Sequence, residues 1–227
     1  MRKHASVALS VPLSTGGHGK VPAPVAVRSP AQEAKRRRIL EAAVRAFARK
    51  GYHACRVGEI ASEAGVAYGL VYHYFTSKDE ILETIFRETW SQMLTAIEAV
   101  EEDGVPAAEQ LRKVCAIVLR TWKRDPDLVR VLVREVTRSP HIQREVEEIE
   151  LAYAALQRIV QRGQDDREFR ADIEARVAAL IVYGALEEIL TSWVMGQLDD
   201  SDEEVDRAEQ AVVSLVRDGL RVRAPAN

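Results

Sequence analysis

The sequence predicts an all-α fold of about nine helices, and three observations carry this prediction. Much of the chain's glycine and proline lies before residue 31, and the remainder of the chain is rich in Ala, Leu, Glu and Arg, residues that favour helices. Apolar residues recur there at the three- and four-residue spacing of an amphipathic helix. No segment alternates polar and apolar residues in the manner of a half-buried strand.

The first 31 residues form a separate region, which we predict to be a flexible basic arm. Residues 1–30 mix Pro, Gly, Ser and Val, contain no Asp or Glu, and show no periodicity. From Gln32 to Lys50 the apolar residues form one stripe, and Gly51 follows in the position that commonly ends a helix. We therefore divide the chain into an arm (1–31), an N-terminal helical domain (32–77) and a larger helical domain (78–227).

Two short helices follow the first one, and their spacing indicates a helix-turn-helix. The segments from Val57 to Ala64 and from Tyr68 to Phe75 are each about two turns long, and Gly65 lies in the turn between them. In a DNA-binding helix-turn-helix the second helix enters the major groove. The N-terminal domain is therefore predicted to bind DNA through the segment that begins at Tyr68.

The rest of the chain is predicted to be helical throughout. Ser77 and Glu80 match a capping box, in which the hydroxyl caps the new helix and the carboxylate three residues later reaches back. The breaks between the later helices fall at glycine, proline or polar stretches. The predicted helices cover residues 78–101, 106–123, 126–137, 140–163, 173–196 and 202–221.

Charge is distributed unevenly along the chain. Residues 1–80 carry 13 Lys and Arg against 6 Asp and Glu, whereas residues 81–227 carry 19 against 29. A basic front on an acidic body suits a module that binds a polyanion, joined to a domain that does not touch it. A basic tail beside an ordinary domain has the same distribution, so charge alone leaves both interpretations open.

Several other classes of protein find no support in the sequence. The chain lacks the G-x-S-x-G, H-E-x-x-H and P-loop patterns, and its five histidines have no metal-ligand spacing, so we expect neither an enzyme nor a metal site. The acidic stretch 199–203 lacks the glycine and the closing spacing of a calcium loop. Cys55 and Cys115 fit no disulfide framework, and no apolar run approaches the ~20 residues of a membrane span. We expect a cytoplasmic protein at the nucleoid, without a membrane partner.

Residues 36–90 resemble the DNA-binding domain of the TetR family of transcriptional regulators. The matching residues, all at fixed spacing, are Gly51, Tyr52, Val57, Ile60, Ala61, Ala64, Gly65, Val66, Gly69, Val71, Tyr72, Tyr74, Phe75, Ser77, Lys78, Ile81 and Leu82. Cys55 and Ala67 depart from the family, which often has a hydroxyl residue at the start of each short helix; loss of such a cap costs ~1 kcal/mol. The resemblance implies a homodimer with a variable, helical ligand-binding body.

The C-terminal part resembles one branch of this family, the FadR regulators. The resemblance covers Leu128–Arg144 and especially Tyr183–Met195, with Gly184, Glu188 and Thr191. It implies a repressor of fatty-acid degradation genes with long-chain acyl-CoA as its effector and no cofactor. One alternative is a repressor of an efflux or other metabolic gene that senses a different lipophilic molecule. Another is an architectural DNA binder, for which saturable binding of a small molecule is not expected.

The residues expected to contact double-stranded operator DNA lie on and around the second short helix. Gly69 lets the backbone approach the duplex, and Tyr68 can reach a base edge. Tyr72 and His73 are placed for phosphates, and the next helix offers a further phosphate site at its N-terminus. Basic residues before these helices add attraction that does not depend on the DNA sequence. The expected contacts are Arg36, Arg56, Tyr68, Gly69, Tyr72, His73, Ser77 and Lys78.

The expected ligand site lies between the helices of residues 78–196. Apolar and aromatic residues at helical spacing line such sites, but they also form ordinary cores, so both interpretations stay open. Residues 112–144 carry nine Arg and Lys against three acids, which favours an anionic ligand because arginine binds phosphate well. Exposed arginines that pair with nearby acids are the alternative. The expected ligand-binding residues are Trp90, Leu94, Ile97, Trp122, Arg130, Leu132, Arg134, Arg138, Tyr153, Leu156 and Tyr183.

The last two predicted helices are expected to form a homodimer interface. Both carry broad apolar faces with small residues that let helices approach closely. Packing inside one subunit is the alternative, and the family resemblance favours the dimer. The expected interface residues are Val177, Ile181, Gly184, Val212, Leu215 and Val216. A two-fold dimer implies a pseudo-palindromic operator, from which the protein is released when a ligand shifts the body helices.

Overall fold

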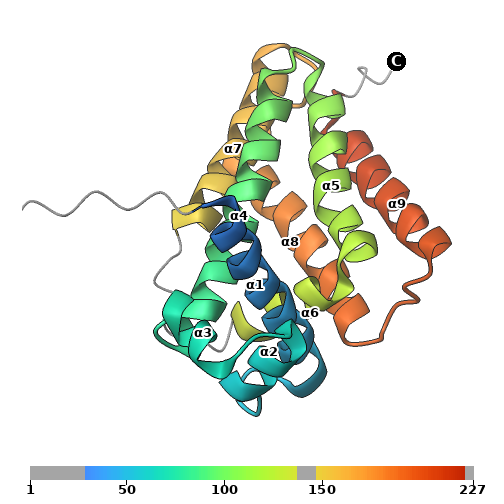
Figure 1. The fold of residues 1–227 in the computed structure, drawn as a ribbon. Helices are drawn as coiled ribbons and strands as arrows, with labels where there is room; N and C mark the ends of the chain where they lie inside the picture. The colour runs from blue at the N-terminus through green and yellow to red at the C-terminus, as the bar shows by residue number, and fades with distance from the viewer. Residues whose placement is uncertain (1–28, 137–146, 223–227) are drawn as a thin grey trace, which may run out of the picture.

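The computed structural model describes residues 29–136 and 147–222, and these fold into nine α-helices (Figure 1). The helices are α1 Pro30–Lys50, α2 Val57–Ala64, α3 Tyr68–Tyr74, α4 Lys78–Glu102, α5 Ala107–Arg124, α6 Pro126–Val136, α7 Glu147–Asp165, α8 Ala175–Val194 and α9 Asp202–Leu220. The predicted all-α class is confirmed. The predicted helix from residue 140 corresponds to α7, and residues 140–146 lie outside the described part of the chain.

The first helix begins earlier than predicted. The Ser29 hydroxyl accepts a hydrogen bond from the Gln32 amide at 3.3 Å, and the Gln32 side chain accepts one from the Ser29 amide at 2.8 Å. This reciprocal pair is a capping box, and Pro30 suits the first helical position because it has no N–H to satisfy. The helix therefore starts inside the segment predicted as an arm (1–31), whose residues 1–28 lie outside the described residues.

α1, α2, α3 and the first half of α4 share one hydrophobic core. Its fully buried members include Ile39 of α1, Ile60 of α2, Val71 of α3 and Ile81 of α4. Gly65 ends α2 with a φ of 63°, a left-handed conformation that glycine adopts without steric cost. The chain turns there directly into α3, so the predicted helix-turn-helix is present.

The start of α4 is capped by the predicted residue. The Ser77 hydroxyl accepts a hydrogen bond from the Glu80 amide at 3.0 Å. The Glu80 carboxylate reaches back to Thr76, where it accepts hydrogen bonds from the amide at 2.6 Å and from the hydroxyl at 2.7 Å. Both contacts satisfy groups that a helix N-terminus otherwise leaves unpaired.

The body of the molecule is built around a second hydrophobic core. α5, α7, α8, α9 and the second half of α4 contribute to it, and Leu119, Ile159 and Val205 are among its fully buried residues. In Figure 1, α5 and α9 lie side by side along one edge of the body, while α7 and α8 pack together beside α4. The helix-turn-helix domain lies at one end of this bundle.

Two helices belong to both cores. In α4, Phe86 is buried in the helix-turn-helix core and Ile97 in the body core; in α6, Val131 belongs to the first core and Val129 to the second. α6 also packs along α1. α4 and α6 therefore connect the body directly to the helix-turn-helix domain.

α8 is the most apolar helix among the described residues, although Arg176, Glu187 and Glu188 interrupt its apolar run. By length and composition alone this helix could cross a membrane, because its most apolar 18-residue window has a mean hydropathy of 1.5. The helices of a protein core pass the same test, and 39% of the window is buried inside the folded chain. Val182 and Leu186 pack in the body core, whereas Val177 and Ile181 are exposed.

Candidate DNA interface and effector cavity

α3 presents a polar and aromatic surface to solvent. Tyr68 and Tyr72 are 57% and 45% exposed, and their hydroxyl oxygens lie 3.2 Å apart. This hydrogen bond raises the pKa of Tyr72. Gly69 and His73 are exposed on the same short helix, while Val71 faces the core. Four of the residues predicted to contact DNA thus belong to one solvent-exposed helix.

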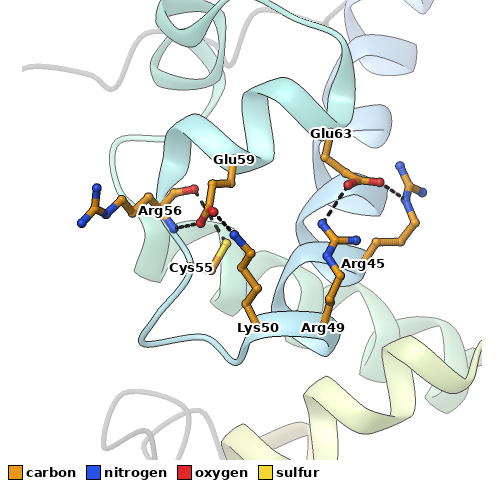
Figure 2. Close-up of polar contacts among 7 residues, drawn as sticks. All are labelled: Arg45, Arg49, Lys50, Cys55, Arg56, Glu59 and Glu63. Atoms are coloured by element: carbon orange, nitrogen blue, oxygen red, sulfur yellow. Dashed lines mark hydrogen bonds and ion pairs between the residues drawn. The ribbon is translucent and has the colours of Figure 1, made fainter.

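Charged contacts tie α2 to α1 (Figure 2). The Glu63 carboxylate of α2 accepts hydrogen bonds from Nε of Arg45 at 2.9 Å and from Nη2 of Arg49 at 3.0 Å. Glu59 accepts one from the Lys50 ammonium group. These hydrogen bonds lower the pKa of both carboxyl groups. Three cations of α1 are therefore engaged in positioning the helix that precedes α3.

Arg56 lies at the start of α2 with an exposed side chain. Its backbone N–H donates to the Glu59 carboxylate at 2.9 Å, a contact that caps the helix although the capping position holds no hydroxyl residue. We expected Cys55 to occupy the capping position of α2, but Arg56, one residue later, occupies it. Ala67 occupies the capping position of α3, as expected. Figure 2 shows the Arg56 guanidinium group pointing away from the Glu59 carboxylate.

Arg36 lies in the interior, which corrects the expectation that it contacts DNA. Its side chain is only 11% exposed, and its guanidinium group pairs with Glu33 of α1 and Glu88 of α4. The group also lies 5.7 Å from the centre of the Phe75 ring. Its charge is therefore neutralised at the contact between α1 and α4 and is not presented to a phosphate.

Lys78 also points inward. Its ammonium group donates hydrogen bonds to the carbonyl oxygens of Tyr52 at 2.7 Å, Cys55 at 2.9 Å and His53 at 3.3 Å. These contacts use all three donors of the group. Lys78 holds the segment between α1 and α2 against α4, and the neighbouring Ser77 hydroxyl caps α4. The structure thus employs Lys78 inside the domain, which corrects its predicted role as a phosphate contact. The Ser77 hydroxyl accepts from the Glu80 amide and can still donate its own proton, so its predicted phosphate contact stays a prediction.

A cavity of about 320 Å³ lies inside the body, with walls from α4, α5, α6, α7 and α8. Sites for small molecules have volumes of roughly 300–1,000 Å³ and mostly apolar walls with a few polar groups. This wall is mostly apolar, and its charged residues are Arg134 and Glu187. The predicted ligand residues that line it are Trp90, Ile97, Leu132, Arg134, Leu156 and Tyr183.

Two residues predicted to bind the ligand lie away from the cavity, Trp122 in the body core and Arg130 against its ring. Trp122 is buried, and its ring centre lies 5.9 Å from that of Trp193. The Arg130 guanidinium group lies 5.1 Å from the centre of the Trp122 ring and pairs with Asp127 at 2.9 Å. Neither Trp122 nor Arg130 lines the cavity, so their assignment as ligand contacts is corrected.

Three further predicted ligand residues also lie away from the cavity wall or outside the described chain. Tyr153 packs against Tyr183, with ring centres 4.3 Å apart, and so supports a cavity residue without lining the cavity. Burial raises the pKa of the Tyr183 hydroxyl. Leu94 lies on α4 and does not line the cavity. Arg138 lies outside the described residues.

Several cavity residues escaped the sequence analysis. They lie on the apolar stripes of the five surrounding helices, so periodicity alone marks them as interior. Nothing in a sequence pattern separates a packed core residue from one that faces a void. The residues missed in this way include Met93, Val114, Val118, Val133, Leu186 and Leu190.

The described part of the basic stretch 112–144, which ends at residue 136, does not converge on the cavity. Nε and Nη2 of Arg120 donate to the Glu209 carboxylate at 2.7 and 2.9 Å, and Lys123 pairs with Asp206 at 2.8 Å. Among the described Arg and Lys residues of this stretch, Arg134 alone lines the cavity. Most of these charges thus pair with nearby acids. This agrees with the alternative interpretation given above, in which the stretch does not form an anion-binding site.

Two family models match the two halves of this structure. The model described as bacterial regulatory proteins, tetR family, matches residues 39–85, which hold the helix-turn-helix. The model described as YsiA-like protein, C-terminal region, matches residues 86–216, which hold the cavity. The chain belongs to the TetR family. It is therefore a bacterial DNA-binding transcriptional regulator and not an enzyme.

Known relatives place this TetR-family regulator near the FadR proteins. The fatty acid metabolism regulator protein of Bacillus subtilis is 29% identical over 184 residues, which are 80% of this chain and 93% of the relative. The structure of FadR from Bacillus subtilis in complex with stearoyl-CoA has a TM-score of 0.72 at 28% identity, covering 82% of this chain and 99% of that one. FadR from Bacillus halodurans has a TM-score of 0.72 at 26% identity, covering 86% and 99%. The predicted resemblance to FadR regulators is confirmed.

The regulator exposes an apolar face on α8 and α9. Val177, Leu180 and Ile181 of α8 are 44%, 46% and 61% exposed, and Leu215 of α9 is 75% exposed. Gly184 is exposed on α8, and a Cβ atom placed there would meet no other residue within 4 Å. Clustered exposed apolar residues on a folded domain mark an interaction surface.

Two predicted interface residues of α9 do not belong to this face. Val212 is buried in the body core of its own subunit, and Val216 packs against the same core. The expectation for Val212 is corrected, because a residue that is 4% exposed in one subunit has almost no surface left for a partner. The alternative of packing inside one subunit applies to this side of α9, while Leu215 points outward.

Proposed function

We propose that this regulator is a homodimeric repressor of fatty-acid degradation genes that leaves operator DNA when it binds long-chain acyl-CoA. The observation that carries the proposal is the apolar cavity, whose wall is partly formed by α4 and α6. Both helices also belong to the core of the helix-turn-helix domain. A ligand in the cavity therefore contacts helices that also pack in the domain that holds α3. The similarity to a FadR protein that holds stearoyl-CoA supports acyl-CoA as the ligand class.

The DNA contacts in this proposal come from α3 and from the start of α2. Tyr68 and Gly69 face base edges in the major groove, while Tyr72, His73 and Arg56 contact phosphates, since all five are exposed. Phosphate contacts fix the register on DNA, and base contacts supply specificity. In a two-fold dimer the two copies of α3 bind the two half-sites of a pseudo-palindromic operator.

The dimer in this proposal forms through the apolar face of α8 and α9. Burial of Ile181 and Leu215 against a second copy removes from water two strongly exposed apolar side chains of these helices. This dimer contact also explains why α8 is apolar, so no membrane is needed to cover its exposed residues. The protein then acts in the cytoplasm, at the nucleoid.

Acyl-CoA suits the cavity because its two parts differ in polarity. The hydrocarbon chain matches the apolar wall, whereas the phosphates of CoA are costly to bury and stay near the surface. Arg134 is the exposed cation on the cavity wall, and its Nη1 donates to the carbonyl oxygen of Ala48 in α1 at 3.3 Å. A phosphate that draws Arg134 away would loosen a contact between the ligand site and the helix-turn-helix domain.

The test measures operator binding by fluorescence anisotropy, with DNA from the region upstream of the protein's own gene. We expect a tight complex that dissociates when stearoyl-CoA is added and persists with free stearate or CoA alone. A coupling free energy of about 1–3 kcal/mol is typical for such effectors and corresponds to a weakening of about 5–150-fold. A complex that is unaffected by stearoyl-CoA contradicts the ligand but leaves the DNA-binding function in place.

A second candidate ligand class is a lipophilic cation, and one residue favours it. Glu187 lines the cavity together with Tyr183, and an acid next to aromatic rings is the arrangement that binds organic cations. The Glu187→Gln variant separates the two ligand classes. It weakens binding of a cationic dye such as ethidium if the site takes cations, and leaves binding of stearoyl-CoA unchanged or tighter if the site takes acyl-CoA.

A further inference from the structure

The indole nitrogen of Trp90 is a buried hydrogen-bond donor without an acceptor. Within the part of the chain that the structure describes, it is the buried side-chain polar atom that has no hydrogen-bond partner. Trp90 belongs to α4 and lines the cavity. Buried polar groups in folded proteins almost always have a partner, and an indole N–H can only donate. A ligand bound in the cavity therefore lies against the side chain that carries this unpaired donor.

The neighbours of Trp90 leave this donor available to a ligand. The preceding residue, Thr89, also lines the cavity, but its hydroxyl donates to the carbonyl oxygen of Ile85 at 2.7 Å. The Trp90 ring also packs against Phe86, with ring centres 6.4 Å apart, and against the helix-turn-helix core. The N–H group thus belongs to a side chain that contacts the DNA-binding domain and the cavity at once.

We propose that the Trp90 N–H donates a hydrogen bond to the thioester carbonyl oxygen of the acyl-CoA effector. This inference rests on the proposed function and assigns the orientation of that ligand. The carbonyl is the acceptor at the junction between the hydrocarbon chain and CoA, so an apolar cavity that holds the chain meets this group at its polar end. Arg134, which reaches α1, lies on the cavity wall with Trp90 and suits the CoA part of the ligand, whose phosphates the pantetheine arm separates from the thioester.

This orientation follows the order of cavity residues along α4. Thr89 and Trp90 lie nearer the helix-turn-helix domain than Met93 and Ile97, which follow one and two turns later on the same helix. The acyl chain then extends from Trp90 past Ile97, toward the apolar residues of α7. Trp90 is a specificity-determining residue, because it distinguishes a thioester from a plain hydrocarbon at the point where α4 enters the DNA-binding domain.

The experiment compares stearoyl-CoA with S-octadecyl-CoA, a thioether in which a CH2 group replaces the carbonyl. Binding of each to the full chain is measured by titration calorimetry. We expect the wild-type protein to bind the thioester about 5–10-fold more tightly, as one uncompensated buried hydrogen bond implies. Trp90→Phe removes this preference, because both ligands then meet a ring without a donor. Trp122→Phe is the matched control and keeps the preference, since Trp122 is buried away from the cavity.

A second measurement uses only the wild-type protein, so its result does not depend on whether the Trp90 variant folds. Stearoyl-CoA labelled with 13C at the thioester carbonyl is bound to the protein, and its infrared stretch is recorded. A shift to lower frequency relative to the same thioester in an aprotic solvent supports the hydrogen bond. An unshifted band overturns it, and so does a thioester preference that survives in Trp90→Phe. If the wild-type protein binds both ligands equally, the inference fails while the acyl-CoA proposal stands; if it binds neither, both fail.

Discussion

The Lys78 ammonium group lies 4.4 Å from the centre of the Tyr52 ring and donates to the Tyr52 carbonyl oxygen at 2.7 Å. The Tyr52 hydroxyl in turn donates to the carboxylate of Asp79, the residue after Lys78. Two consecutive residues at the start of α4 thus hold the same tyrosine from both ends. Because α4 continues into the body, this contact transmits the position of α4 to the segment between α1 and α2.

Replacement of Lys78 should therefore destabilise the DNA-binding domain. Lys78→Ala leaves three carbonyl oxygens without their charged donor, and we expect a loss of about 2 kcal/mol in the free energy of unfolding. Urea unfolding followed by circular dichroism measures this loss. Lys35→Ala is the control, since Lys35 is exposed on α1 and should change stability little. A Lys78→Ala protein of unchanged stability that binds DNA more weakly would restore the phosphate-binding role.

Tyr68 should affect operator recognition without affecting the fold. Its side chain is 57% exposed, and its polar contact is with the similarly exposed Tyr72. We expect Tyr68→Ala to weaken binding to the operator by about 10-fold, in the range of one lost base contact. Anisotropy titrations on the operator and on a scrambled duplex make the comparison. Equal weakening on both duplexes would mean that Tyr68 contacts the DNA backbone and does not specify sequence.

The helices could be predicted closely because their limits are set by nearby residues. Gly65 in the turn and the serine that caps α4 are visible in the sequence, and both end or begin helices through contacts within four residues. The capping box of Ser29 and Gln32 has the same local character and was available to the same reasoning. The prediction missed it because the surrounding residues resemble a flexible arm.

Whether the role of a functional residue could be predicted depended on how far away in the sequence its contact partners lie. Exposed residues of α3 follow from helical periodicity alone. Arg36 was assigned to DNA because it stands in a basic run, whereas its partner Glu88 lies 52 positions later in the chain. Lys78 has partners 26 and 23 positions earlier. A single sequence does not reveal such pairs, and a basic residue that is tied inside the fold has the same pattern as one that faces a phosphate.

Two residues of α9 should respond in opposite ways to substitution. Leu215→Glu places a charge on the exposed apolar face, so we expect monomers in sedimentation velocity with an unchanged circular dichroism spectrum. Val212→Ala removes buried methyl groups from the body core, so we expect a loss of about 1–3 kcal/mol in stability with the dimer retained. A Leu215→Glu protein that stays dimeric at micromolar concentration would place the interface elsewhere.

Cys115 should couple stability to alkaline pH. Burial raises the pKa of its thiol to about 12 from an ordinary value of 9.0. A folded-state pKa above the unfolded one means that this contribution to stability is fully present below pH 9 and is lost as the pH rises toward 12. We expect the free energy of unfolding to fall more steeply with pH across this window in the wild-type protein than in Cys115→Ala. Parallel profiles would show that the thiol is not protected by the fold.

Filling the cavity should separate DNA binding from its release. Ala152 of α7 is buried and lines the cavity, so Ala152→Phe places a ring in a space of about 320 Å³. Because the side chain enters a void, we expect the fold and operator affinity to persist while stearoyl-CoA no longer binds or releases DNA. Leu151→Phe is the matched control, since the neighbouring Leu151 is 43% exposed and does not line the cavity. Normal release from Ala152→Phe would place the effector site outside this cavity.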